Sequence, residues 1–249
     1  MTDEIEERIL AQEWFYRYQL PSGRWTSLYI PDDVAHIHET RLEMMSAALS
    51  PYFEQHGAGM TAIDLASHQG FFSMHLARHC SHVLGLEYKQ RHVDSANLIK
   101  AVYQIANMDF RQENVETMAP GSYEPVDIVL MFGLLYHLEN PIRVLRRARE
   151  LTKKVLLIET QTTILDLEGP VDAGHVSYTN YMHGYFGLFA GAPDNIDGSV
   201  SNIICYPSPK GLLWVLRQLG FATAEILPPP PGAYQQLATH KRIMVRATL

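Results

Sequence analysis

The chain reads TAIDLASHQGFFS over residues 61–73. An apolar run ends at Asp64, and small residues then lead to Gly70 and a second apolar segment. This order predicts a strand over 61–66, a tight turn, and a helix over 70–79. The next apolar run, over 82–87, ends at Glu87 and predicts a second strand. In an open α/β sheet, such a turn followed by such an acid binds a nucleoside through backbone groups and ribose hydroxyls.

The residues of the turn narrow the choice of cofactor. A dinucleotide fingerprint has three glycines spaced as G-x-G-x-x-G, which let backbone N–H groups approach a pyrophosphate. The corresponding positions here hold Ala66, His68 and Phe71, and two of these side chains are bulky. The turn therefore favours a cofactor without phosphate, such as S-adenosylmethionine. An ordinary turn in a protein that binds no nucleotide is the alternative.

Three later stretches carry a family resemblance. They read FRQENVETM over 110–118, VDIVLMFGLLYHLENP over 126–141, and LTKKVLLIET over 151–160. Together with residues 61–87, they are similar to class I S-adenosylmethionine-dependent methyltransferases. The GLLYHLENP segment resembles the branch that includes the tRNA wobble-uridine carboxymethyltransferases and related small-molecule methyltransferases.

The pattern of apolar and turn residues predicts an α/β fold with a mostly parallel sheet and helices on both faces. Further strands are expected over 108–112, 126–131, 154–159, 222–228 and 241–248, and helices over 3–16, 38–54, 89–105, 140–150 and 208–219. Pro51 is expected to mark the end of its helix. The resemblance implies a Rossmann-like class I methyltransferase fold with seven strands, the last antiparallel and inserted near the fifth.

The chain is expected to divide into two parts. Residues 1–55 form an N-terminal helical and aromatic cap segment, and residues 56–249 form the methyltransferase domain. Within this domain, residues 161–207 are rich in Gly, Asn, Asp and aromatic residues. Because irregular stretches of this length are usually functional, we expect a lid insertion that forms part of the substrate wall. A cap without substrate contact is the alternative.

Charge and composition limit the partners. The net charge of −7 disfavours a nucleic-acid partner, which would need a basic face. No apolar stretch is long enough to span a membrane, and the acidic N-terminus is unlike a signal peptide. Two cysteines give no disulfide framework, so a cytoplasmic protein is expected. A small-molecule substrate is expected, and a homodimer is left open.

Twelve histidines raise the question of a metal site. His36 and His38 are two residues apart, and His75 and His79 are four apart. Neither pair comes with a third ligand in a recognised spacing, so no metal is predicted.

The strand pattern and the resemblance together assign a cofactor site. Glu87 is expected on the ribose, Asn114 and Val115 along the adenine, and Asp64 at the methionine end. The full set of cofactor-binding candidates is Asp64, Ala66, Ser67, Gly70, Glu87, Tyr88, Asn114, Val115, Phe132 and Gly133.

The catalytic candidates follow from the chemistry of a sulfonium methyl. Such a methyl is already activated, so the protein has to align the reactants, exclude water and, for some acceptors, accept a proton. The candidates are Tyr136, His137, Asn140, Tyr178 and Tyr181. By resemblance, Tyr136 matches a tyrosine that contacts the cofactor, whereas His137 is either a catalytic group or a buried histidine bonded to backbone. Asn140 also suits the N-cap of a helix that begins at Pro141.

The expected function is an S-adenosylmethionine-dependent methyltransferase that acts on a small-molecule acceptor by direct displacement. One alternative is an S-adenosylmethionine cyclase that forms azetidine-2-carboxylate and methylthioadenosine. A second is a tRNA-modifying methyl- or carboxymethyltransferase, and a third is a cofactor-binding protein without catalysis.

Overall fold

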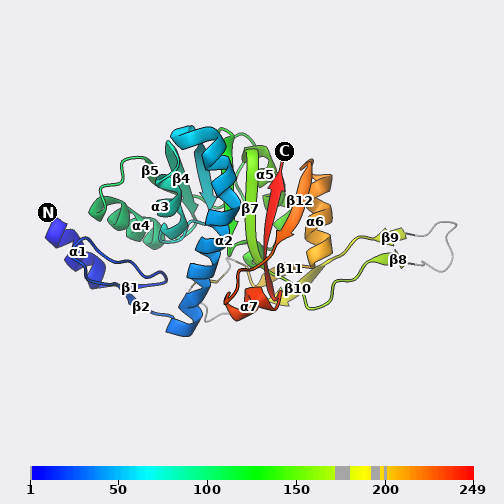
Figure 1. The fold of residues 1–249 in the computed structure, drawn as a ribbon. Helices are drawn as coiled ribbons and strands as arrows, with labels where there is room; N and C mark the ends of the chain where they lie inside the picture. Colours follow the sequence, from blue (N-terminus) through cyan, green and yellow to red (C-terminus); the bar gives the residue numbers. More distant parts are fainter. Residues whose placement is uncertain (1, 172–179, 192–196, 199–200) are drawn as a thin grey trace.

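The computed structural model describes residues 2–171, 180–191, 197–198 and 201–249. A seven-stranded sheet forms its centre, in the order β12-β13-β7-β6-β3-β4-β5 (Figure 1). The strands are β3 (Thr61–Leu65), β4 (His82–Glu87), β5 (Met108–Gln112), β6 (Val126–Phe132), β7 (Thr152–Gln161), β12 (Thr223–Leu227) and β13 (Arg242–Thr248). Strands β3 to β7 pair in parallel, and β13 runs antiparallel between β7 and β12. The predicted fold class, including the inserted last strand, is confirmed.

Alternation along the strands gives the sheet two separate apolar faces. Ala62 packs in one core cluster and Ile63 in the other, because successive side chains of a strand point to opposite faces. The first cluster is covered by α2 (Asp32–His56), α3 (Phe71–Ala77) and α4 (Gln90–Val102), and the second by α5 (Pro141–Leu151) and α6 (Pro209–Gln218). The short helix α7 (Gln235–Ala238) precedes β13.

The N-terminal segment shares the core of the sheet. It contains α1 (Thr2–Leu10), β1 (Glu13–Trp14), β2 (Ser27–Leu28) and α2. Trp14, Tyr16 and Tyr18 are buried in the first core cluster, and the short β1–β2 pair replaces the end of the helix expected over 3–16. The expectation that Pro51 ends its helix is wrong, since α2 continues to His56. Tyr52 and Phe53 beyond this proline pack on the core, which offsets the backbone hydrogen bond that proline cannot make.

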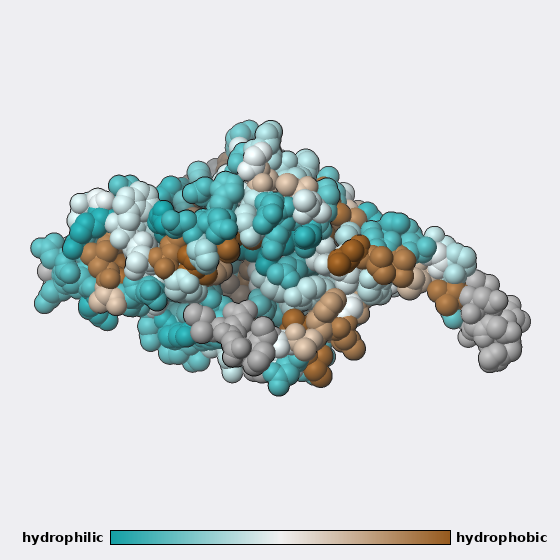
Figure 2. All heavy atoms as spheres, turned by 90° about the horizontal axis from the view of Figure 1, so that it is seen from below, coloured by the Kyte–Doolittle hydropathy of each residue, from teal (hydrophilic) through white to brown (hydrophobic). Residues whose placement is uncertain are grey.

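The insertion contains strands where the sequence predicted an irregular segment. These are β8 (Gly169–Val171), β9 (Asn180–Met182), β10 (Phe186–Ala190) and β11 (Ile203–Pro207), which pair as β8–β9 and β10–β11. The β8–β9 ribbon projects away from the body of the molecule (Figure 1). Figure 2 shows apolar side chains at the surface near β10–β11, where Leu188, Phe189 and Ile203 are exposed. In the described part of the chain, no helix combines the length and apolarity needed to cross a membrane.

Candidate active site

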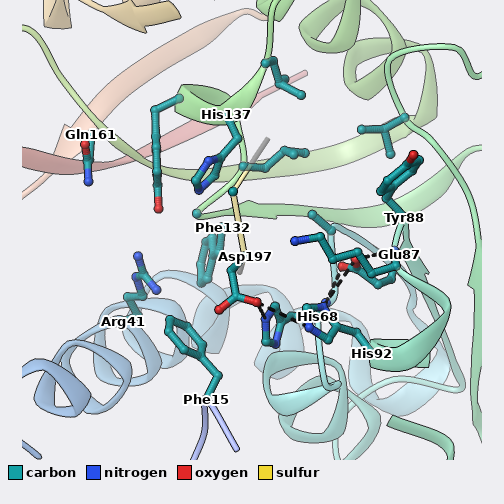
Figure 3. Close-up of a pocket in the computed structure, with 18 of the residues that line it drawn as sticks. Phe15, Arg41, His68, Glu87, Tyr88, His92, Phe132, His137, Gln161 and Asp197 are labelled. Carbon is teal, nitrogen blue, oxygen red and sulfur yellow. Dashed lines mark hydrogen bonds and ion pairs between the residues drawn. The ribbon is translucent and has the colours of Figure 1, made fainter. Parts of the chain in front are cut away.

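A cavity of about 420 Å³ lies at the carboxyl ends of the parallel strands (Figure 3). Ligands bind at this edge of open α/β sheets, and the volume lies within the range of small-molecule sites. Tyr136 and His137 line the cavity, as predicted for the catalytic wall. Seven of the predicted cofactor-binding residues also line it: Ala66, Glu87, Tyr88, Asn114, Val115, Phe132 and Gly133.

A turn joins β3 to α3, as the sequence predicts. Three of the predicted cofactor-binding residues in this region, Asp64, Ser67 and Gly70, lie outside the cavity lining. Asp64 is buried and accepts a hydrogen bond from the Ser73 hydroxyl at 2.7 Å. Burial raises the pKa of Asp64 to about 7. Ser67 is buried as well, and its backbone N–H donates to Leu86.

Gly70 also lies outside the cavity lining, at the N-cap of α3. Its φ is +84°, and a Cβ there would lie 2.6 Å from the ring of Phe110. The structure therefore requires this glycine for the helix start and its packing. Close approach of the cofactor at Gly70 stays a prediction.

Glu87 ends β4 and presents an ordered carboxylate to the cavity. The backbone N–H groups of His68 and Lys89 donate to its two oxygens at 3.0 and 2.8 Å. Burial raises the pKa of Glu87, but His92, the Lys89 N–H and His68 outweigh this effect and hold the pKa below its usual value. Glu87 is therefore ionised near neutral pH and suited to accept hydrogen bonds from vicinal ribose hydroxyls.

A cluster that sequence analysis missed lies beside Glu87. The ring nitrogens of His68 and His92 lie 3.2 and 3.4 Å from the carboxylate of Asp197 (Figure 3). The Tyr29 hydroxyl donates to the same carboxylate at 2.6 Å. His68, His92 and Asp197 are, within the described residues, a group whose donor atoms are close enough to hold a metal ion. They come from distant segments, so no spacing motif could reveal them. The absence of a metal stays a prediction.

A second group that sequence analysis missed forms the opposite end of the cavity. Arg41 of α2 and Arg242 of β13 contact the two oxygens of Glu159 on β7, at 2.7 and 2.9 Å. Arg242 also donates to the Tyr136 hydroxyl at 2.8 Å. Burial raises the pKa of Glu159, but Arg242 and Arg41 outweigh it and hold the pKa below its usual value. We call Arg41, Glu159 and Arg242 the arginine cluster.

His137 lies between the two ends of the cavity, with its ring 4.2 Å from that of Tyr136. Burial, reinforced by the positive charge of Arg242, lowers the pKa of His137 to about 4. The imidazole is therefore neutral near neutral pH and able to accept a proton.

Two of the remaining catalytic candidates, Asn140 and Tyr181, lie outside the lining of this site. Asn140 is exposed at the N-cap of α5, makes no side-chain capping bond and lies outside the cavity lining. Tyr181 is 54% exposed on β9, next to His183, and is also absent from the lining. Its strand belongs to the projecting ribbon, which carries it away from the sheet edge (Figure 1). Tyr178 lies outside the described residues.

The family model of a methyltransferase domain matches residues 56–180. The chain belongs to this family. Over 96 residues, this chain is 27% identical to a ubiquinone biosynthesis O-methyltransferase of Acinetobacter baylyi. The matched stretch covers 39% of this chain and 40% of that relative. The match thus spans less than half the length of this curated relative.

Solved structures support the fold of the methyltransferase. The N-terminal domain of EvdMO1, crystallised with SAH and D-fucose, is 18% identical and has a TM-score of 0.69, with 99% of this chain and 94% of that chain covered. Magnesium protoporphyrin IX methyltransferase from Synechocystis PCC 6803, with bound SAH, is 13% identical and has a TM-score of 0.59, with 99% and 93% covered.

With the family and the fold established, the prediction of a methyltransferase with the class I fold is confirmed. S-adenosylmethionine, which the sequence predicts, is the cofactor considered for this cavity. The residues of the cavity fit this cofactor. Glu87 supplies an ionised carboxylate for a diol, and Phe132 and Tyr88 supply aromatic surface. Gly133 has a φ of +68°, and a Cβ there would point toward the Tyr136 hydroxyl, 3.6 Å away. The closer relation to the tRNA wobble-uridine enzymes stays a prediction.

Proposed function

We propose that the protein transfers the methyl group of S-adenosylmethionine to a small-molecule acceptor inside this cavity. The observation that carries the proposal is the continuity of the site. One cavity joins the ionised Glu87 to the Tyr136–His137 wall, so a cofactor held at one end faces an acceptor at the other. Direct displacement needs this alignment more than it needs a chemical catalyst.

The residues of the chain have distinct roles in this proposal. Glu87 holds the ribose, and Asn114 and Val115 lie along the adenine. Phe132 and Gly133, at the end of β6, border the reacting sulfur. The bound cofactor supplies an electrophilic methyl on a sulfonium.

Tyr136 and His137 contact the acceptor in the same proposal. The neutral His137 accepts a proton when the acceptor carries one on the attacking atom. Tyr29 and Asp197, which meet over the Glu87 end, help to exclude water.

The products test this proposal. The protein is incubated with S-adenosylmethionine labelled in the methyl group, first alone and then with the small-molecule filtrate of a cell extract or with tRNA. We expect S-adenosylhomocysteine in equal amount with a labelled small molecule, and no product from the cofactor alone. Methylthioadenosine formed without acceptor, or label found in tRNA alone, would contradict the proposal.

The cytoplasmic location expected from the cysteine content stays part of the same proposal.

A further inference from the structure

The arginine cluster carries an unbalanced positive charge. It contains two guanidinium groups and one carboxylate, and all three side chains are less than a tenth exposed. Burial lowers the pKa of Arg242, but Glu159 and Tyr136 outweigh it and hold the pKa above its usual value, so this residue stays charged. A buried charge without a counter-ion is unfavourable, and an anion that enters the cavity would neutralise it.

Arg41 has hydrogen-bonding capacity to spare. Its Nε is buried and has no hydrogen-bond partner among the residues that the structure describes. Its terminal nitrogen lies 3.8 Å from the position of a Cβ on Gly133, and the guanidinium points into the cavity (Figure 3). Guanidinium groups recognise carboxylates through paired N–H donors, so this geometry suits a planar anion.

The groups packed around the cluster do not cancel its charge. Burial and the nearby Arg41 hold the pKa of His38 well below its usual value, and His137 is neutral for similar reasons. The carboxylate of Asp197 is engaged by Tyr29, His68 and His92. On the far side, Gln161, Tyr234 and Gln236 line the cavity with neutral polar groups.

The position of the cluster separates it from the ribose end. Glu87 lies on β4, whereas Glu159 lies on β7, three strands away in the order β7-β6-β3-β4. At about 4.8 Å between neighbours, these strands are about 14 Å apart. Under the proposed function, the cofactor extends from β4 toward the end of β6, so the arginine cluster lies beyond the reacting sulfur.

We propose that the arginine cluster binds a carboxylate group of the acceptor, through Arg41 and Arg242. This inference rests on the proposed function, and it restricts the acceptor to small organic acids. The methionine carboxylate of the cofactor is a second source of the same chemical group, and the experiment has to distinguish the two.

The test measures binding of simple acids to the complex with S-adenosylhomocysteine. Benzoate, phenylacetate and salicylate are titrated by calorimetry, each beside its carboxamide. The proteins are the wild type, Arg41→Met, Arg41→Lys and, as a matched control, Arg146→Met. Arg146 is exposed on α5 and does not line the cavity. Arg41→Met leaves Glu159 paired with Arg242, so the cluster becomes neutral and the variant is expected to fold.

We expect at least one of the acids to bind the wild type tenfold or more tightly than its amide. Arg41→Met should abolish this preference, Arg41→Lys should keep part of it, and Arg146→Met should keep all of it. Equal binding of every acid and its amide by the wild type would overturn the inference. If Arg41→Met fails to fold, this wild-type comparison and Arg41→Lys still decide it.

Binding of the cofactor product shows whether the arginine cluster holds the carboxylate of the acceptor or that of the cofactor. If Arg41→Met weakens binding of S-adenosylhomocysteine tenfold but leaves methylthioadenosine binding unchanged, the carboxylate is that of the cofactor and the inference is overturned. If the wild type binds no S-adenosylhomocysteine at all, the proposed function fails instead.

Discussion

The two ends of the cavity are built in different ways. At the proposed adenosine end, Glu87 and the backbone that holds it come from short consecutive segments between β3 and α4, and backbone N–H groups donate to its carboxylate. The arginine end comes from α2, β7 and β13, and its charged side chains hold one another. A site made of local backbone geometry is set by a short motif, whereas a site made of distant side chains depends on the whole fold. Four substitutions test the two ends and the residues beside them.

The largest effect is expected from Glu159→Gln at the arginine end. The substitution leaves Arg41 and Arg242 buried without a counter-charge, so the free energy of unfolding should fall by about 3–5 kcal/mol. Urea denaturation measures it. Glu225→Gln is the matched control, because Glu225 forms an exposed pair with Arg246 and should cost less than about 1 kcal/mol. Equal effects of the two substitutions would show that the cluster is solvated.

The second effect concerns Asp64, beneath the adenosine end. The pKa of Asp64 is about 7 in the folded protein, against an ordinary value of 3.8. The folded state therefore binds more protons than the unfolded state between these values, and its stability falls as the pH rises from about 4 to about 7. Asp64→Asn should remove this fall and raise the free energy of unfolding at pH 8 by about 1–3 kcal/mol. Parallel stability curves for the two proteins between pH 4 and 8 would contradict the prediction.

The third and smaller effect concerns the pKa of His137, which lies between the two ends. Its imidazole should titrate near pH 4, because burial and Arg242 disfavour the charged form. NMR of the ring protons measures the midpoint. Arg242→Met should raise it, since the substitution removes a nearby positive charge. A wild-type midpoint near 6.5 would place the ring in contact with solvent and contradict its burial beside Arg242.

The smallest effect is expected from Asn140→Ala. The side chain of Asn140 is exposed and makes no capping bond, so the melting temperature should barely change, with a cost below about 0.5 kcal/mol. Ser208→Ala is the comparison, because the Ser208 hydroxyl accepts hydrogen bonds from the N–H groups of Gly211 and Tyr185 at the start of α6. This cap should be worth about 1 kcal/mol. Loss of activity in Asn140→Ala without loss of stability would return Asn140 to the catalytic wall.

The sequence predicted the fold because the strands carry strong local signals. The apolar run that ends at Asp64 and the one that ends at Glu87 have the length and the boundaries of buried parallel strands. Ala66, Glu87 and Asn114 lie at or just after the ends of these two strands and the next, so the sequence could place them at the edge of the sheet where the cavity lies. The helix through Pro51 could not, because tertiary packing outweighs the local cost of proline.

The rest of the site depends on contacts between distant segments. Arg41, Glu159 and Arg242 belong to no spacing motif, and each is an ordinary charged residue until the sheet brings them together. Asp197 is similar, since its partners Tyr29, His68 and His92 lie far away in the chain. Tyr181 shows the opposite case. It belongs to a segment rich in aromatic residues, which predicted a substrate wall, but it lies on the projecting ribbon and outside the cavity lining.

The central claim is that the cofactor binds at the Glu87 end of the cavity and not at the arginine end. Calorimetry tests it most directly, by measuring the affinity of S-adenosylhomocysteine for Glu87→Ala and for Arg41→Met side by side. Melting temperatures first establish that both variants fold. Removal of a charge-assisted hydrogen bond costs about 1.5–3 kcal/mol, so Glu87→Ala should weaken binding by about tenfold or more. Arg41→Met should leave the dissociation constant within about twofold of the wild type, which corresponds to less than about 0.5 kcal/mol. Unchanged binding in Glu87→Ala, or an equal loss in both variants, would contradict the assignment of the cofactor to the Glu87 end.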